Sequence, residues 1–516
     1  MRRRHIAWIV LVALLARSVR AVQQWDAFEV SLKSKAEGNP FIDTSLSATF
    51  TNGDTSIEAR GFYDGDENYR IRFMPPSPGQ WRYETHSNVA ALDHQTGTFD
   101  CQTASGANHG PVRVRNTYHF AYADGTAYKP IGTTSYGWVC QPDAMEDQTI
   151  ATLAKSPFNK IRMSVQPIPY AASKDQLDLF PFEKTSDGKW DFTRFNPKFF
   201  QHLERRIAQL RDLNVQADLI LFVPYNAKLG FTEMSREDDE RYVRYLVARL
   251  SAYRNVWWSL ANEYDLIRTR ETKDWDRIGR LIASDDPYQH LRSIHFSKNI
   301  FEPSAPWVTH ISVQNGNAVA DFGRASLYRD ACTKPVLYDE VCYEGDVDKR
   351  WGQLSGEEMT MRFWLGTIGG TYVGHGEVTQ HPEAKSWTAR GGELSGASPA
   401  RISFLKQILD DAPAEGIEPI DRYFESNIAG KPGTYYLVYF GKEPTKDWTI
   451  SLYKDSLTDG MKFQLDVLDT WNMTITHDPR TFTLKRHDPY YFHDREEAKV
   501  DLGGKPFMAV RLRRVD

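Results

Sequence analysis

Cysteine is scarce in this 516-residue chain, and the short motifs that mark metal sites are missing. Four cysteines are too few for a disulfide framework, although Cys332 and Cys342 flank one predicted strand and either pair or stay reduced. The chain contains no C-x-x-C or H-x-x-x-H spacing, which are common arrangements of zinc ligands. The sequence therefore predicts no metal site and no cofactor.

A charge excess of one sign is also absent. The chain has 63 Lys and Arg against 68 Asp and Glu, a net charge of −5, and its one basic run lies at the extreme N-terminus. Proteins that bind nucleic acid concentrate positive charge on one face or along one helix. We therefore expect no nucleic-acid partner, and nothing in the sequence fixes the oligomeric state.

Long apolar runs are missing after residue 21. The first residues are basic ("MRRRH"), an apolar stretch of 11 follows ("IAWIVLVALLA"), and "SVRA" ends with small residues at Val19 and Ala21. This order is typical of a signal peptide over residues 1–21. The stretch is short for a membrane span, so a retained N-terminal anchor is the less favoured alternative. We expect an exported protein, periplasmic or extracellular, with no membrane span in the mature chain.

Aromatic residues are abundant: they make up 13% of the chain, with 14 Trp and 25 Tyr. They either fill cores or offer flat surfaces on which sugar rings stack.

The length indicates two or three domains. Residues 22–115 alternate apolar and polar residues and break at Asn-Gly, Asp-Gly and Pro-Gly, which predicts a β-sandwich. Residues 416–516 return to the same pattern after a last helix, and they predict a second antiparallel sandwich.

The middle segment, residues 116–415, alternates short apolar runs with amphipathic helical stretches. Eight runs have the character of buried strands: "YKPIGTT", "NKIRMSV", "QADLILFV", "NVWWSLA", "LRSIHF", "VTHISVQ", "KPVLYD" and "GGTYVGH". Eight β-then-α units in about 300 residues predict a (β/α)8 TIM barrel. A doubly wound sheet is the alternative, but no G-x-G-x-x-G follows the first strand. The predicted fold class is α/β: a (β/α)8 barrel flanked by N-terminal and C-terminal antiparallel β-sandwich domains.

Acidic residues end two of the predicted barrel strands. Glu263 follows the fourth strand in "NVWWSLANEYDL", and Asp339-Glu340 ends the seventh in "KPVLYDEVCYEG". All strands of a parallel barrel end at the same rim, and strands four and seven lie across its mouth. Retaining glycosidases need two carboxyl groups about 5–5.5 Å apart, one as acid/base and one as nucleophile.

These motifs resemble the clan A (β/α)8 retaining glycoside hydrolases, whose signature is Asn-Glu at the fourth strand and Glu at the seventh. Within that clan, "KPVLYDEVCYEG" and "GGTYVGHGE" resemble the apiosidase-like hydrolases, and "RGFYDGDENYRIRFMPPSPGQWRYETHSN" resembles the N-terminal sandwich that precedes many bacterial barrels of this kind. The resemblance implies that Glu263 is the acid/base, Glu340 the nucleophile, and Asn262 a contact of the sugar 2-hydroxyl. The apiosidases themselves carry an Asp in a Gly-rich context where this chain has "ANEYD", which disfavours apiose as the substrate.

Each acid also has a structural interpretation. Asn262 and Glu263 would make a good helix start, and Glu340 alone would make an ordinary surface acid. Asp339 is disfavoured as the nucleophile because neighbours on a strand face opposite ways. Glu344 lies further along the loop, where it orients the nucleophile or binds sugar.

Further candidates for substrate binding lie at the other strand ends. Arg162, near the second strand, would keep a nearby carboxylate ionised, with a structural ion pair as the alternative. Trp387 lies in the Gly-rich loop "SWTARGGELSG", where it is either a lid or part of the core. Tyr136 and Trp138 follow the first strand and are candidates for the floor of the sugar site. Candidates for hydrogen bonds to the sugar are His295, Gln314, Asn315, His375 and Glu377, and a structural role is equally open for the two histidines.

The sequence favours an exported retaining glycoside hydrolase that acts on a poly- or oligosaccharide through two glutamates. The first alternative is a non-catalytic carbohydrate-binding surface protein on a decayed barrel, which the presence of both Glu263 and Glu340 opposes. The second alternative is a metal-dependent barrel hydrolase, which would need H-x-H after the first strand, where this chain has "GTTSYGW".

Overall fold

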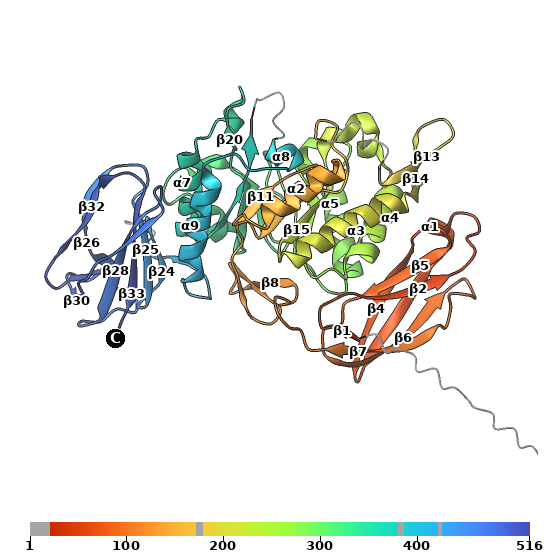
Figure 1. Cartoon of the computed structure of the whole chain (residues 1–516), viewed down its shortest axis with the longest axis horizontal. Helices are drawn as coiled ribbons and strands as arrows, with labels where there is room; N and C mark the ends of the chain where they lie inside the picture. Colours follow the sequence, from red (N-terminus) through yellow and green to blue (C-terminus); the bar gives the residue numbers. More distant parts are fainter. Residues whose placement is uncertain (1–20, 172–178, 380–385, 422–425) are drawn as a thin grey trace, which may run out of the picture.

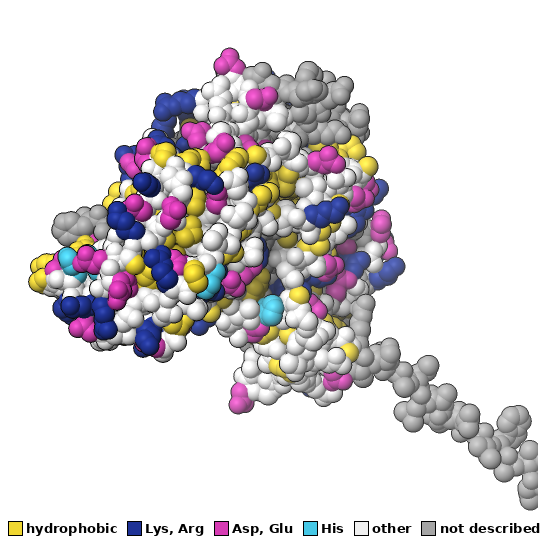
Figure 2. Space-filling model, turned by 60° about the vertical axis from the view of Figure 1, so that its left-hand side comes forward, with side chains coloured by type: hydrophobic (Ala, Val, Ile, Leu, Met, Phe, Trp, Pro, Cys, Tyr) yellow, Lys and Arg dark blue, Asp and Glu magenta, His cyan; other side chains and the backbone are white. Residues whose placement is uncertain are grey.

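The computed structural model describes residues 21–171, 179–379, 386–421 and 426–516. The signal peptide predicted over residues 1–21 lies outside these ranges, except for Ala21. The molecule has a barrel at its centre, with one β-domain at each end of the long axis (Figure 1). On the face shown in Figure 2, basic and acidic side chains intermingle, in keeping with the nearly balanced charge.

The N-terminal domain contains seven strands in the order β1-β7-β6-β3-β4-β5-β2. They are β1 (Ala21–Gln23), β2 (Phe28–Lys33), β3 (Leu46–Asn52), β4 (Thr55–Tyr63), β5 (Asn68–Phe73), β6 (Gly79–Ser87) and β7 (Thr96–Gln102), with the short helix α1 (Pro40–Asp43) between β2 and β3. The first part of β4 pairs with β3 and its last part with β5, so the strands form two layers. Phe28 stacks on Phe99 across the layers at 3.8 Å. The domain is antiparallel as expected, except that β1 pairs in parallel with β7.

Eight parallel strands form the central barrel, in the order β17-β16-β15-β12-β11-β21-β19-β18. An isolated parallel bridge between His295 and Ser312 closes it. The strands lie in the eight predicted apolar runs, which confirms the predicted barrel: β11 (Gly132–Thr134), β12 (Lys160–Ser164), β15 (Gln216–Phe222), β16 (Val256–Ala261), β17 (Arg292–Ser293), β18 (Ile311–Gln314), β19 (Val336–Glu340) and β21 (Tyr372–His375).

Helices surround the barrel, and their ends follow the usual capping rules. They are α2 (Asp143–Leu153), α3 (Pro197–Asp212), α4 (Arg236–Leu250), α5 (Thr272–Asp285), α6 (Ala325–Cys332), α7 (Gly356–Ile368), α8 (Trp387–Arg390) and α9 (Ser398–Asp410). Ser235 and Asp238 form a capping box at the start of α4. In the described residues between β17 and β18 no helix follows the strand, because Pro303 and Pro306 break that segment. One of the eight predicted β-then-α units therefore lacks its helix.

A small sheet closes the amino-terminal end of the barrel. Its strands are β8 (Val112–Arg115), β9 (His119–Tyr122) and β10 (Ala127–Tyr128). Phe120 and Tyr128 pack in one cluster with Trp257 and Leu337, which lie near the starts of β16 and β19. The predicted domain boundary at residues 115 and 116 falls within this sheet. Because the sheet seals one end, the carboxyl ends of the strands form the open face.

The C-terminal domain is antiparallel in every strand pair of its described residues. Its strands are β23 (Glu418–Pro419), β24 (Ile428–Lys431), β25 (Tyr435–Tyr439), β26 (Thr445–Thr449), β27 (Ser451–Tyr453), β28 (Lys462–Asp469), β29 (Thr474–His477), β30 (Phe482–Arg486), β31 (Tyr491–Asp494), β32 (Lys499–Lys505) and β33 (Met508–Arg514). Val500 of β32 shares one buried core with Phe463 and Leu512 of the main sheet.

Both β-domains pack against the barrel. At the N-terminal side, Arg249 of α4 is fully buried and forms ion pairs with Asp64 of the sandwich at 2.7 Å and with Glu204 of α3 at 2.5 Å. Arg72 of β5 pairs with the same Glu204 at 2.7 Å. At the C-terminal side, Trp364 of α7 stacks on Tyr439 of β25 at 5.2 Å between ring centres.

The four cysteines are all free thiols, so the pairing of Cys332 and Cys342 left open by the sequence does not form. Cys101 and Cys140 are buried. Among the described residues, no helix is both long and apolar enough to cross a membrane.

Candidate active site

A cavity of about 640 Å³ opens at the carboxyl ends of the barrel strands. Glu263 and Glu340, which the sequence places after the fourth and seventh strands, both line it. Most of the remaining lining is aromatic or small and neutral: Tyr136, Tyr170, Tyr225, Gln314, Gly316, Cys342, Tyr343, Val347, Trp351, Val378, Thr379, Ser386, Thr388 and Ala389. The cavity therefore presents two carboxyl groups within a wall of aromatic faces.

Glu340 is the last residue of β19, and its carboxyl group is held by positive charge and hydrogen bonds. Arg162 Nη1 donates to its Oε1 at 3.1 Å, and the Tyr136 hydroxyl donates to the same oxygen. Burial would raise the pKa of Glu340, but His295, Arg162 and the Tyr136 hydrogen bond outweigh it and hold the pKa below its ordinary value. Glu340 is therefore ionised at neutral pH.

Glu263 shows the opposite shift. Burial and the nearby negative charge of Glu340 raise the pKa of its carboxyl group, against the hydrogen bond donated by the Tyr225 hydroxyl. Its backbone lies in the left-handed region, with φ of 42°, which is unusual for a residue other than glycine. This conformation turns the chain out of β16 at the rim, where the side chain faces the cavity.

His295 follows β17 and contacts both carboxyl residues. Its Nδ1 accepts from the backbone N–H of Glu263 at 3.3 Å, and its Nε2 lies 3.7 Å from Glu340 Oε1. Burial and the neighbouring Arg162 lower the pKa of His295 to about 3, so the ring is neutral at neutral pH. Because Nδ1 accepts a hydrogen bond, the neutral ring carries its proton on Nε2, which faces Glu340. Arg162 then supplies the permanent positive charge beside Glu340.

A continuous chain of hydrogen bonds joins the two glutamates. Arg162 donates a hydrogen bond to Glu340, and its Nη2–H donates a second one to Asn262 Oδ1 at 2.5 Å. Asn262 Nδ2 donates in turn to the Tyr225 hydroxyl at 3.1 Å, and that hydroxyl donates to Glu263. Arg162 and Asn262 are fully buried, so the geometry of the pair is fixed from within the barrel.

Three of the predicted candidates lie in the structural framework and not in the cavity wall. Trp138 is fully buried in η1 (Trp138–Cys140) and donates Nε1–H to the sulfur of Met163 at 3.3 Å. Asn315 caps η6 (Gly316–Val319) by accepting from the Asn317 N–H at 3.1 Å. Trp387 is 1% exposed, which places it in the core and not in a lid, although its neighbours Ser386 and Thr388 line the cavity.

Glu344, His375 and Glu377 form a buried group behind the cavity wall. Glu344 and Glu377 pair across β20 (Glu344–Gly345) and β22 (Glu377–Val378). Their carboxylates accept hydrogen bonds from backbone N–H groups of one short segment: Glu377 from Ser395 at 2.8 Å, and Glu344 from Ala397 at 2.6 Å and Ser398 at 3.1 Å. The spacing of this group suits a metal ion, but its carboxylates already hold the segment before α9. Asp339, as alternation predicts, points elsewhere and pairs with Lys160 at 2.9 Å.

Tyrosines and a tryptophan complete the cavity, and the sequence did not single them out. Tyr225 begins the loop after β15, where the sequence carries "LFVPYN", and its place after the third strand was the available signal. Tyr343 lies three residues after Glu340, with its hydroxyl 3.5 Å from that of Tyr136. Tyr170 and Trp351 are 53% and 48% exposed and lie at the open side, where a ligand meets them first.

A barrel with two buried glutamates at its open carboxyl face has the architecture of a glycoside hydrolase. The comparison with known families agrees: residues 115–414 match the model of the apiosidase-like catalytic domain, which covers more than half of the chain. The chain belongs to the apiosidase-like family. Residues 21–88 and 424–513 match two domains of unknown function, DUF5060 and DUF5605.

Solved structures support this assignment. A crystal structure from Bacteroides vulgatus, named as a candidate glycoside hydrolase, is 40% identical, with a TM-score of 0.92 over 96% of this chain and 100% of its own. A glycoside hydrolase of family 5 from the same organism is 15% identical, with a TM-score of 0.56 over 79% of this chain and 93% of its own, and shows the shared fold. No curated protein matches the chain.

Proposed function

We propose that the protein is an exported retaining glycosidase that cleaves O-glycosidic bonds in poly- or oligosaccharides, with Glu340 as nucleophile and Glu263 as acid/base. The observation that carries this proposal is the placement of the two glutamates in one cavity: Arg162 and Tyr136 donate to Glu340 and lower its pKa, while burial and the charge of Glu340 raise the pKa of Glu263. A double displacement needs one ionised and one protonated carboxyl group at the same pH.

In the first step, the ionised Glu340 attacks the anomeric carbon while Glu263 gives its proton to the departing glycosidic oxygen. The products are a covalent glycosyl ester on Glu340 and a free alcohol. Glu263 is now ionised and takes a proton from water, whose oxygen attacks the anomeric carbon and breaks the ester. Both carboxyl groups return to their starting states, and the sugar leaves with its original anomeric configuration.

The residues around the two glutamates stabilise the ionised form of Glu340 and fix the orientation of Asn262. Arg162 and Tyr136 donate to Glu340 and stabilise its charge before attack and after release. Asn262, proposed to contact the sugar 2-hydroxyl, is engaged by Arg162 and Tyr225, which fixes its orientation at the cavity. These contacts support preorganised charge stabilisation, which contributes strongly to enzymatic catalysis.

The lining supports an uncharged sugar as the substrate. Among the described residues that line the cavity there is no Lys or Arg, so none there would pair with a sugar carboxylate or sulfate. Tyrosine and tryptophan faces suit the apolar faces of neutral pyranose or furanose rings. The "ANEYD" sequence differs from that of the apiosidases, and we therefore propose a neutral sugar other than apiose.

Proton NMR of the first turnover tests the mechanism. With a panel of neutral oligosaccharides, we expect the released sugar to show the anomer of the substrate, before mutarotation mixes the two. Release of the opposite anomer would exclude Glu340 as a nucleophile.

Export is tested separately: after expression of the full chain in a Gram-negative host, we expect the protein in the periplasm or medium with residues 1–21 removed.

A further inference from the structure

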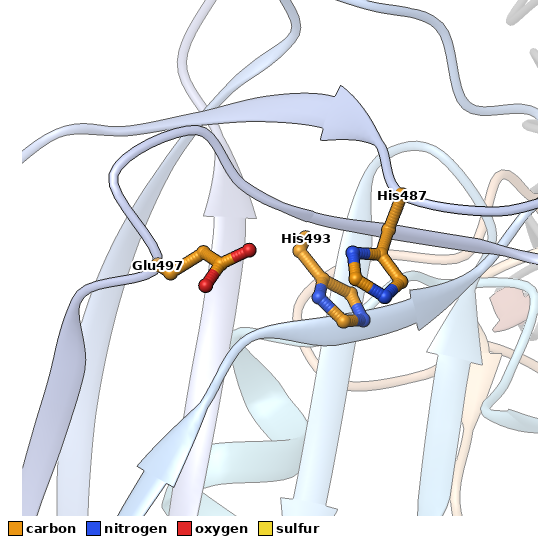
Figure 3. Close-up of side chains that lie close together, drawn as sticks. All are labelled: His487, His493 and Glu497. Carbon is orange, nitrogen blue, oxygen red and sulfur yellow. The ribbon is translucent and has the colours of Figure 1, made fainter.

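Two histidines and one glutamate come together on the C-terminal domain, and none of them lines the catalytic cavity. His493 belongs to β31, His487 follows β30, and Glu497 lies in the turn after β31. Figure 3 shows the two imidazole rings face to face, with the carboxylate of Glu497 directed toward them. The ring centres are 3.8 Å apart, and one donor atom from each residue lies within 4.8 Å of the other two.

The hairpin geometry explains why these residues meet. His493 pairs with Lys485, and the His487 N–H donates to the Tyr491 carbonyl at 3.0 Å. His487 and His493 are therefore diagonal neighbours, which project from the same face of the hairpin. Glu497 is brought back by a turn in which its N–H donates to the Asp494 carbonyl at 3.0 Å.

We propose that His487, His493 and Glu497 bind a divalent first-row transition metal ion, with Zn²⁺ as the reference ion. Two imidazole nitrogens and one carboxylate oxygen form a donor set that suits this class of metal, and a water molecule would fill the fourth position. Ligand atoms on a tetrahedral Zn²⁺ lie about 3.3–3.4 Å apart, given bond lengths of about 2.0–2.1 Å. To reach that value around one ion, the two imidazole rings have to rotate out of their stacked arrangement, for which the exposure of His487 and Glu497 leaves room.

The three side chains are available for a ligand. In the described parts of the chain, none of them makes a side-chain hydrogen bond or ion pair with another residue; the stacking of the two rings is their contact. Lys485, the cross-strand partner of His493, carries a positive charge that opposes a cation here, and Asp488, the residue after His487, carries a negative charge.

A metal ion at this position would tie the β30–β31 hairpin to the 495–498 turn. It would stabilise the C-terminal domain without touching the barrel, so it does not depend on the proposed glycosidase activity. Because protons compete with the metal for the imidazole nitrogens, binding should weaken in acid.

Isothermal titration of the full chain, without an affinity tag and after treatment with EDTA, tests the site with Zn²⁺ alone. We expect one Zn²⁺ per chain, and an affinity at least about tenfold lower in H487A and in H493A, since even second-shell changes at metal sites cost about 10–100-fold. His94→Ala is the matched control, because it removes an exposed histidine of the N-terminal sandwich. It should bind Zn²⁺ as the unaltered chain does.

Thermal unfolding provides an independent measurement. Zn²⁺ should raise the unfolding midpoint of the unaltered chain and of H94A, and leave the midpoint of the double variant H487A/H493A unchanged. Circular dichroism without metal checks that the variants fold. Equal Zn²⁺ binding by the double variant and the unaltered chain would overturn the proposal and direct attention to Glu344, His375 and Glu377. Failure of the unaltered chain to bind Zn²⁺ would overturn it as well, with no bearing on glycosidase activity.

Discussion

The backbone N–H of Glu263 donates to Nδ1 of His295, and the other ring nitrogen of His295 faces Glu340. One neutral imidazole thus holds the strained backbone of the proposed acid/base and directs an N–H toward the proposed nucleophile. His295 therefore contacts both glutamates, although it takes no part in bond cleavage itself.

Replacing His295 by asparagine should lower kcat by up to about 10²-fold, the scale seen when one preorganised donor is removed. The acid limb of the kcat/KM profile should also move to higher pH, because the Nε2–H of the neutral His295 ring faces the Glu340 carboxylate and favours its ionised form. His310→Asn is the control: this buried histidine lies at the closed end of the barrel, against Trp257. The control should change stability and leave the pH profile in place; the same shift in both variants would contradict the assigned role.

The pH dependence of kcat/KM should be bell-shaped. Activity rises as Glu340 loses its proton, and this limb should lie below the ordinary range of a glutamate because the pKa is lowered. Activity falls as Glu263 loses its proton, and this limb should lie above that range because the pKa is raised. With an activated substrate that needs no acid assistance, E263Q should lose the alkaline limb in the glycosylation step. Persistence of that limb would assign it to another group.

The two glutamates should respond differently to substitution. E340A should abolish turnover, and azide or formate should restore it with inverted stereochemistry, because the anion occupies the space of the missing nucleophile. E263A should accept substrates with good leaving groups but hydrolyse the intermediate slowly, and azide should restore it with retention. Proton NMR of the glycosyl azides distinguishes the two, and identical stereochemistry from both variants would refute the assignment.

Tyr225→Phe should shift the alkaline limb to higher pH. The hydroxyl of Tyr225 donates to the ionised form of Glu263 and therefore lowers its pKa, so its removal raises that pKa further. Tyr170→Phe is the matched control: it removes a tyrosine hydroxyl from the same cavity that makes no direct hydrogen bond to Glu263 within the described residues. A limb that moves equally in both variants would show a general change of the cavity.

The ion pairs that join the N-terminal sandwich to the barrel should matter for stability. Arg249→Met removes a fully buried guanidinium from Asp64 and Glu204, which keep Arg70 and Arg72 as partners, and should cost up to about 3–5 kcal/mol of unfolding free energy. Arg60→Met removes a pair between the same two regions, but Arg60 is 52% exposed, so the loss should stay below about 1 kcal/mol. Denaturant unfolding followed by circular dichroism measures both, and equal losses would contradict a tightly packed interface.

The barrel was predictable because its strands are short, apolar and regularly spaced, and because Glu263 and Glu340 end strands that face each other across the rim. The direction in which a side chain points was harder to predict from the sequence. Trp138 and Trp387 have the composition of a sugar site, yet both point into the core, since position on a short helix and not residue type decides which face they present. Tyr225 was missed because it follows a strand that ends without a charged residue. The helix expected after β17 was lost to two prolines in an otherwise ordinary connection.

The three-stranded sheet of β8, β9 and β10 determines where the barrel can be cut out as a separate fragment. Its residues lie before the first barrel strand, but they cover Trp257 and Leu337, which come more than 120 residues later. A fragment that started at residue 116 would lose β8 and expose this apolar end to water. Isolation of the catalytic unit therefore has to begin before Val112, and the stretch between the sandwich and the first barrel strand belongs to the enzyme, not to a linker.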